Sequence, residues 1–253
     1  MNHPSITQTT KSSLGHFTVS AAPVRNSPDI IAAAESRRQR PQGVLLGLGS
    51  EGLPVMLNLA DPTPGPLLIL ADAGAGKTHL LRFIAGQISY NHHPDEVQFC
   101  TLTSYPEQWP AYDQLEHCRG ILDCSQASAA NRFAAVIGQV RAMPVRAALL
   151  LLIDDPCLLH PQALDLLHWL LQSGPTTHIW PVVALNAGQA LDVSEWVSRF
   201  RTRIFGRIAD PVLAEEFTPA PDAGLENLQP SPAGKQFSMR SNGHWLRFWV
   251  PFS

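Results

Sequence analysis

Residues 67–78 read Leu67-Leu-Ile-Leu-Ala-Asp-Ala-Gly-Ala-Gly-Lys-Thr78, and this stretch decides the fold. It begins with four apolar residues, which is typical of a strand that a parallel sheet buries on both faces. Two glycines, a lysine and a threonine follow, and apolar residues then recur at helical spacing over 79–88. A strand, a glycine-rich turn and a helix in this order form the pattern of a phosphate-binding loop, or P-loop.

The chemistry of such a loop comes from backbone N–H groups that point into one concavity at a helix N-terminus, where the helix dipole favours an anion. Gly74 and Gly76 suit the open backbone that the loop requires. We expect Lys77 to reach the β- and γ-phosphates of a nucleotide and the Thr78 hydroxyl to hold Mg²⁺. Ala71 stands where the usual pattern begins with glycine, and a plain glycine-rich turn is the alternative interpretation. The predicted nucleotide-binding residues are Asp72, Ala73, Gly74, Ala75, Gly76, Lys77, Thr78 and His79.

Two acidic residues follow the apolar run 147–153. Asp154 is predicted to end a strand beside the P-loop strand and to orient Mg²⁺ together with Thr78, since ligands bind at the carboxyl ends of parallel strands. Asp155 is predicted to be catalytic and to position the attacking water. Many P-loop ATPases carry glutamate there, which is one methylene longer, and a displacement of about 1 Å can cost about 100-fold in rate. The alternative role for Asp155 is to cap the turn before Pro156.

Asn186 ends the apolar strand predicted over 179–185, where a polar side chain could contact the γ-phosphate or the attacking water. We predict that it takes part in catalysis together with Lys77, although asparagine before Ala-Gly is also an ordinary turn residue.

A cluster of arginines, Arg199, Arg201, Arg203 and Arg207, follows this strand. Arg201 and Arg203 are candidates for an arginine that acts in trans on the nucleotide of a neighbouring subunit. The cluster could instead hold a polyphosphate or a DNA backbone. A third interpretation is a solvated strand edge whose positive charges discourage aggregation.

Strands and helices alternate through most of the chain, which predicts an α/β fold with a mostly parallel, doubly wound sheet. A hairpin is expected at each end of the domain. The predicted strands are 44–48, 55–59, 67–70, 96–102, 147–153, 179–185, 202–208, 236–240 and 244–250. The predicted helices are 79–88, 128–143 and 161–172.

The composition agrees with one globular domain and excludes several other classes. The chain has 253 residues, of which 45% are hydrophobic and 15% charged, unlike collagen, coiled coils or highly charged disordered chains. It has 4 Cys without a CxxC pair and 10 His without a metal-ligand spacing, so buried thiols are expected rather than a zinc site. Because there is neither an apolar run of about 18 residues nor a signal-peptide pattern, we expect a cytoplasmic protein without a membrane segment.

The formal charge of −3 is unevenly distributed. Residues 1–43 hold five basic and two acidic side chains and are predicted to be a flexible, locally basic arm, which leaves a charge of −6 for the domain at 44–253. Within this domain, 210–235 is predicted to be a proline-rich connection to the C-terminal hairpin. An acidic body does not favour nucleic-acid binding, so DNA contacts would be confined to the arm or the arginine cluster.

From Val44 to Phe252 the sequence resembles the motor domain of FtsK/HerA-type P-loop ATPases, which are ring-forming DNA and protein translocases. The stretches that carry the resemblance are 46–59, 67–81, 149–155, 178–186 and 202–205, together with the final strand pair that ends at Pro251. The resemblance implies a RecA-like fold, ATP and Mg²⁺ as ligands, and ATP hydrolysis. It also implies a homo-oligomer, of which a hexameric ring is one form, that acts on DNA or another macromolecule.

The sequence departs from the family pattern at three places. Asp155 replaces the usual glutamate, Leu185-Asn186 replaces a Thr-Gln pair, and the segment 171–177 lacks the arginine that often precedes the sensor strand. A long insertion that supplies pore loops in DNA-pumping members is also missing. These departures weigh against processive DNA pumping and favour an alternative function, a nucleotide-binding scaffold or regulatory subunit with little ATP turnover.

Overall fold

The computed structural model describes residues 43–142, 147–156, 161–190, 194–218, 223–228, 235–241 and 243–251. The predicted basic arm, apart from Gly43, lies outside these residues. Within them, none of the helices has the length and apolar character that crossing a membrane requires.

The described strands form one ten-stranded sheet in the order β2-β1-β10-β9-β8-β3-β7-β6-β4-β5. The strands are β1 (Gly43–Gly49), β2 (Pro54–Asn58), β3 (Leu67–Ala71), β4 (Val97–Thr103), β5 (Cys118–Asp123), β6 (Ala148–Asp154), β7 (Ile179–Asn186), β8 (Thr202–Phe205), β9 (Lys235–Ser241) and β10 (His244–Val250). From β8 to β5 all neighbouring strands are parallel, whereas β9, β10, β1 and β2 pair antiparallel. The predicted α/β fold with a mostly parallel sheet and antiparallel hairpins is therefore confirmed.

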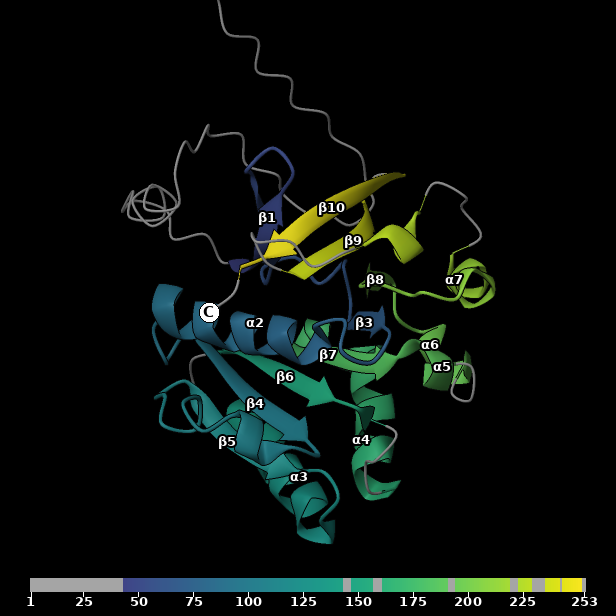
Figure 1. The fold of residues 1–253 in the computed structure, drawn as a ribbon. Coiled ribbons are helices and arrows are strands. Elements are labelled where there is room, and N and C mark those ends of the chain that lie inside the picture. The colour runs from purple at the N-terminus through teal and green to yellow at the C-terminus, as the bar shows by residue number, and fades with distance from the viewer. Residues whose placement is uncertain are drawn as a thin grey trace, which may run out of the picture.

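Helices cover both faces of the parallel part (Figure 1). The α-helices are α2 (Lys77–Asn91), α3 (Ala127–Ala142), α4 (Pro161–Ser173), α5 (Ala187–Ala190), α6 (Ser194–Val197) and α7 (Pro211–Phe217). Short 3-10 turns occupy Pro106–Gln108, Pro175–Thr177 and Leu225–Asn227. In Figure 1, α2 covers one face of the sheet, and α3 and α4 cover the opposite face.

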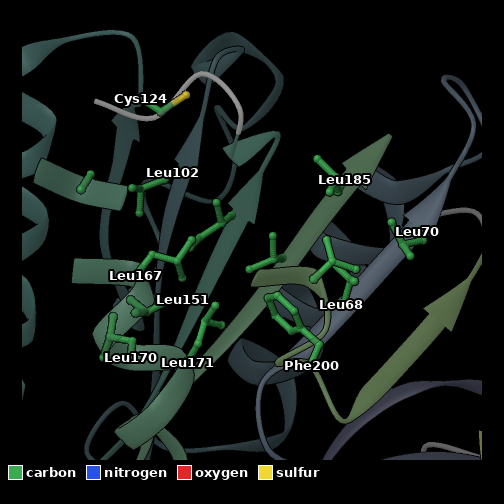
Figure 2. Close-up of a cluster of buried hydrophobic side chains, with 14 of the residues drawn as sticks. Leu68, Leu70, Leu102, Cys124, Leu151, Leu167, Leu170, Leu171, Leu185 and Phe200 are labelled. Atoms are coloured by element: carbon green, nitrogen blue, oxygen red, sulfur yellow. The ribbon is translucent and has the colours of Figure 1, made fainter. Parts of the chain in front are cut away.

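The core consists of two layers because successive side chains of a strand point to opposite faces. In β3, Leu67 and Ile69 pack in the layer under α2, whereas Leu68 and Leu70 pack in the layer that contains α3 and α4. Figure 2 shows part of the second layer, in which Leu167, Leu170 and Leu171 of α4 lie over the sheet. Every residue of β3, β4 and β6 is buried, as expected for strands covered on both faces.

The two predicted hairpins join into one antiparallel extension of the sheet. β1 pairs with β10, and β9 pairs with β8, which is the edge strand of the parallel part. The β9–β10 hairpin turns at Gly243, whose φ of 83° is the left-handed conformation that glycine adopts without strain. The chain thus returns its last strands to a position beside its first ones.

Several elements were not predicted from the sequence. β5 is an edge strand of mixed composition with a single buried residue, so it lacks the apolar run that identifies a central strand. It also contains Gly120 at a φ of 141°. The four-residue helices α5 and α6 are too short for helical periodicity, and α7 lies inside the segment 210–235 that was predicted to be a proline-rich connection.

Candidate functional site

The candidate site lies where the carboxyl ends of β3, β6 and β7 meet. In the parallel register, Ala71 at the end of β3 lies opposite Asn186 at the end of β7. Asp154, at the end of β6, lies opposite Ala184 of β7. The P-loop and the predicted acidic and amide residues are therefore brought to one edge of the sheet, where α/β proteins bind their ligands.

The P-loop backbone has the open conformations that its glycines allow. Gly74 and Gly76 have φ angles of 76° and 103°, and Gly76 is the N-cap residue of α2. The Ala75 N–H donates to the Asp72 carbonyl at 3.2 Å, which closes a turn in the loop. The helix begins at Lys77, so its first free N–H groups and its positive dipole end lie at the loop.

Lys77 is anchored within the protein by all three of its N–H donors. Its Nζ donates to the carbonyl oxygens of Ala71 and Asp72 at 3.2 and 2.9 Å, and to Oδ1 of Asn186 at 2.7 Å. The side chain is only 9% exposed. Burial lowers the pKa of the ammonium, against the opposing effect of the nearby carboxylates, chiefly that of Asp154. A phosphate that binds Lys77 must therefore take the place of one of these acceptors.

Thr78 and Asp154 contact each other directly, and the Thr78 hydroxyl donates to Oδ2 of Asp154 at 2.7 Å. Asp154 is buried, and burial raises the pKa of its carboxyl, opposed first by the Thr78 hydrogen bond and then by the Lys77 charge. A hydroxyl and a carboxylate beside a phosphate-binding loop are the hard oxygen donors that Mg²⁺ prefers. These two residues therefore fit the predicted metal role.

Asp155 has an uncommon backbone conformation for a residue other than glycine, with a φ of 62°. Its N–H is fixed by a 3.0 Å bond to the Ala184 carbonyl. Its Oδ1 is buried and accepts no hydrogen bond within the part of the chain that the structure describes. A strained residue with an unsatisfied carboxylate oxygen is typical of a functional site.

Asn186 links the sheet edge to the P-loop. Its Oδ1 accepts from Lys77, and its Nδ2 donates to Oε1 of Gln189 at 2.9 Å. Gln189 lies in α5 and was not singled out in the sequence. Its position three residues after Asn186, on one short helical turn, is the only signal that could have found it. The amide of Asn186 is thus oriented by bonds on both sides.

The two ends of the predicted nucleotide-binding segment also contact other elements. The Asp72 carboxylate accepts from the Ala209 N–H at 2.7 Å, and the Asp72 N–H donates to the Arg207 carbonyl at 2.9 Å. At the other end, His79 Nε2 donates to the Pro251 carbonyl at 2.8 Å. These two side chains fasten the P-loop to the segments that follow β8 and β10. Between them, Ala73 and Gly74 are exposed.

Arg201 and Arg203 lie away from the P-loop of their own chain. β8 is parallel to β3 and begins at Thr202 opposite Leu67, so both arginines lie at the amino end of β3 while the P-loop follows its carboxyl end. Arg203 donates to the carbonyl oxygens of Phe200 and Val197, each at 3.4 Å. Arg201 is exposed. A role in trans stays a prediction.

The cysteines behave as buried or half-buried thiols where the structure describes them. Cys100, Cys118 and Cys124 are unpaired, and burial raises the pKa of Cys118 to about 11. Cys157 lies outside the described residues. Among the described side chains, no group of three or more His, Cys, Asp and Glu could hold a metal ion.

Comparison with known proteins identifies the fold. No protein-family model matches the chain, and no curated protein matches it. Among solved structures, ATPases 2 and 3 of Thermomonospora curvata EccC, in complex with a signal sequence peptide, match 88% of this chain with a TM-score of 0.61 and 17% identity. The cytoplasmic domain of the same Type VII secretion ATPase gives a TM-score of 0.62 at 18% identity, again over 88% of this chain.

The chain has the fold of an FtsK/HerA-type P-loop ATPase. EssC from Geobacillus thermodenitrificans (ATPases 2 and 3) also matches, over 91% of this chain, with a TM-score of 0.59 and 12% identity. This chain spans 42%, 28% and 45% of the lengths of the three matched chains, so it is similar to one part of each. The RecA-like fold that the sequence resemblance implied is confirmed.

Proposed function

We propose that the protein binds ATP and hydrolyses it in a Mg²⁺-dependent reaction, as an oligomeric, FtsK/HerA-type motor ATPase. The observation that carries this proposal is the convergence of Lys77, Thr78, Asp154, Asp155 and Asn186 at the carboxyl ends of three neighbouring strands. A plain glycine-rich turn would not require the buried Lys77 and Asp154 that accompany this loop.

Each residue has a defined role in the proposed reaction. The P-loop N–H groups and Lys77 bind the phosphates, and Thr78 and Asp154 would hold Mg²⁺. The metal ion, when bound, offsets the negative charge of the phosphate oxygens. Asp155 orients a water molecule whose oxygen bonds to the γ-phosphorus while the bond to the bridging oxygen of ADP breaks, and it accepts the proton that the water loses.

Asn186 is proposed to detect the γ-phosphate. Its hydrogen bond to Lys77 spans 2.7 Å. A phosphate that claims a Lys77 donor releases Oδ1 of Asn186, which can then contact the attacking water, while Gln189 still holds the amide Nδ2. Occupancy of the P-loop would thereby be coupled to the end of β7.

A nucleotide-binding scaffold with little turnover is the second candidate. The short Asp155 side chain favours it, because the carboxylate is one methylene further from a bound phosphate than that of a glutamate would be. In this case ATP would stabilise an assembly or a partner complex. The macromolecule on which either form acts is proposed to be DNA or a protein, and the EccC match with its bound signal sequence peptide supports the protein alternative.

Phosphate release by the purified oligomer, with double-stranded DNA, single-stranded DNA or no DNA, tests the ATPase. We expect Mg²⁺-dependent turnover that Lys77→Ala lowers by about 100-fold or more, since it removes a cation that stabilises the transferring phosphoryl group. Wild-type turnover no higher than that of Lys77→Ala would overturn the hydrolytic proposal. Equal thermal stabilisation and the same oligomer with ATP and with a slowly hydrolysed analogue, without phosphate release, would support the scaffold.

A further inference from the structure

Lysine is rare in this chain, and two of the lysines lie at the P-loop. The sequence holds fifteen arginines but only three lysines, Lys11, Lys77 and Lys235. Lys11 lies outside the described residues. The other two, Lys77 and Lys235, both lie at the P-loop, although 158 positions separate them in the sequence. One is the P-loop lysine, and the other has no role in the function proposed above.

Lys235 is the first residue of β9, and its side chain lies across the P-loop. A methyl group at position 76 would be 2.9 Å from Cγ of Lys235 and 3.2 Å from its Cβ and Cδ. The aliphatic stem therefore covers Gly76, which is the N-cap residue of α2. Such a close approach is possible only because residue 76 has no side chain. Because Nζ is only two bonds beyond Cδ, the ammonium lies close to the P-loop, where phosphate is expected to bind.

The surrounding strands fix Lys235 in this position. Lys235 pairs with Val250 in the β9–β10 hairpin, which brings the end of β10 beside the start of β9. The next residue, Pro251, accepts the hydrogen bond from His79 in the first turn of α2. The hairpin end is thus attached to the P-loop helix on one side, and the Lys235 stem packs on Gly76 on the other.

The charge of Lys235 has no partner among the described side chains. Its side chain is half-buried, and it makes neither an ion pair nor a side-chain hydrogen bond with any described residue. By contrast, all three donors of Lys77 are occupied. An ammonium carries three N–H donors and a full charge, and both are suited to a phosphate oxygen. Lys235 therefore places beside the P-loop a cation that no described side chain neutralises.

We propose that Lys235 is a second lysine of the nucleotide site and that its ammonium binds a phosphate group of the bound nucleotide. This inference rests on the proposed function, because it requires that the P-loop bind a nucleotide. It assigns to the antiparallel hairpin a direct part in ligand binding. The C-terminal strands would then contact the nucleotide directly, through the side chain of Lys235.

Equilibrium binding of ATP to the full chain tests the proposal. Lys235→Met keeps the aliphatic stem over Gly76 and removes the charge, and we expect the Kd for ATP to rise about tenfold or more. Lys235→Arg should restore most of the affinity. Arg240→Met removes a positive charge from an exposed position on the same strand and should leave the Kd unchanged. Thermal unfolding without nucleotide verifies that each variant is folded.

Two results separate this inference from the proposed function. If the wild type binds ATP, Lys77→Ala loses binding and Lys235→Met binds like the wild type, Lys235 is only a packing residue and the inference is wrong. If the wild type itself does not bind ATP, the proposed function is wrong.

Chemical labelling gives a second, independent measurement. An acyl phosphate of ATP transfers its acyl group to a lysine amine close to the terminal phosphate and releases ATP. Peptide mapping is simple because the chain has only three lysines. We expect acylation of Lys77 and Lys235 that excess ATP suppresses, while any labelling of Lys11 does not respond to ATP. Protected labelling of Lys77 alone would overturn the inference.

Discussion

The parallel and antiparallel parts of the sheet are built from different kinds of sequence. β3, β4 and β6 are buried along their whole length, whereas β2 alternates between buried and half-buried residues and β10 has only two buried positions. Helices cover both faces of the parallel part. In the antiparallel part, only one face is packed against α2. The parallel part holds the fully buried strands and the residues proposed for catalysis. The antiparallel part contributes contacts at its P-loop end.

Matched leucine truncations would test this difference in stability. Leu151→Ala in β6 removes a fully buried side chain, and we expect the free energy of unfolding to fall by about 2–5 kcal/mol. Leu246→Ala in β10 removes the same atoms from a half-buried position and should cost less than half as much. Urea unfolding of both variants measures the two values. Equal losses would show that the antiparallel part is as tightly packed as the parallel part.

A pair of glycine substitutions would test the contact between the two parts. Gly74→Ala and Gly76→Ala each place a side chain at a positive φ, which costs about 1–2 kcal/mol. Only the second also collides with Lys235, since no atom of the described residues, apart from the chain neighbours of Gly74, lies within 4 Å of a methyl group at position 74. We therefore expect Gly76→Ala to destabilise the fold by about 1–3 kcal/mol more than Gly74→Ala.

Adding Lys235→Ala to each glycine variant isolates the collision, because it removes Cγ and Cδ from the space above residue 76. The extra loss of Gly76→Ala in thermal or urea unfolding should mostly disappear in this background, and the Gly74→Ala value should stay the same. An extra loss that persists without the lysine stem would place its cause in the P-loop backbone and not in the hairpin.

The smallest expected effect concerns the buried carboxyl of Asp154 in the parallel part. Burial raises its pKa in the folded chain above the unfolded value, so the folded state binds more protons in the interval between the two. The carboxyl therefore lowers the stability of the folded chain as the pH rises from about 4 through the raised pKa. Asp154→Asn cannot ionise and should not show this loss.

We expect wild-type stability to fall relative to Asp154→Asn over that interval, in the absence of nucleotide and Mg²⁺. Urea unfolding at several pH values measures the difference. A difference that is constant with pH would mean that the Thr78 and Lys77 contacts fully compensate for the burial of the charge.

The sequence predicted those features whose signal is local. Apolar runs predicted β3, α2, β6 and β7. The two glycines and the Lys77-Thr78 pair that follows them predicted the P-loop. β5 has no such signal because an edge strand is exposed to solvent and tolerates mixed residues. A single site could also be predicted from the sequence, because the ends of parallel strands meet at one edge of a sheet. Its residues are Lys77, Thr78, Asp154, Asp155 and Asn186.

The contacts that complete the site could not be predicted, because they depend on tertiary structure. The bond between Lys77 and Asn186 joins residues 109 positions apart, and its presence depends on the rotamers of both side chains. The positive φ of Asp155 is imposed by the turn after β6. The contact of Lys235 with Gly76 requires the exact register of the β9–β10 hairpin and its pairing with β8 and β1.

The pairing of β1 with β10 has a consequence for biosynthesis. A ribosome releases β1 and β2 almost a whole domain length before β10 exists, so the inner edge of this hairpin stays without its partner strand while the parallel core is being made. Unpaired strand edges in such intermediates promote aggregation. A translation product that stops before β9 would contain every P-loop residue and still lack both Lys235 and the strand that covers β1. We therefore expect such truncated chains to be substrates for chaperones and proteases.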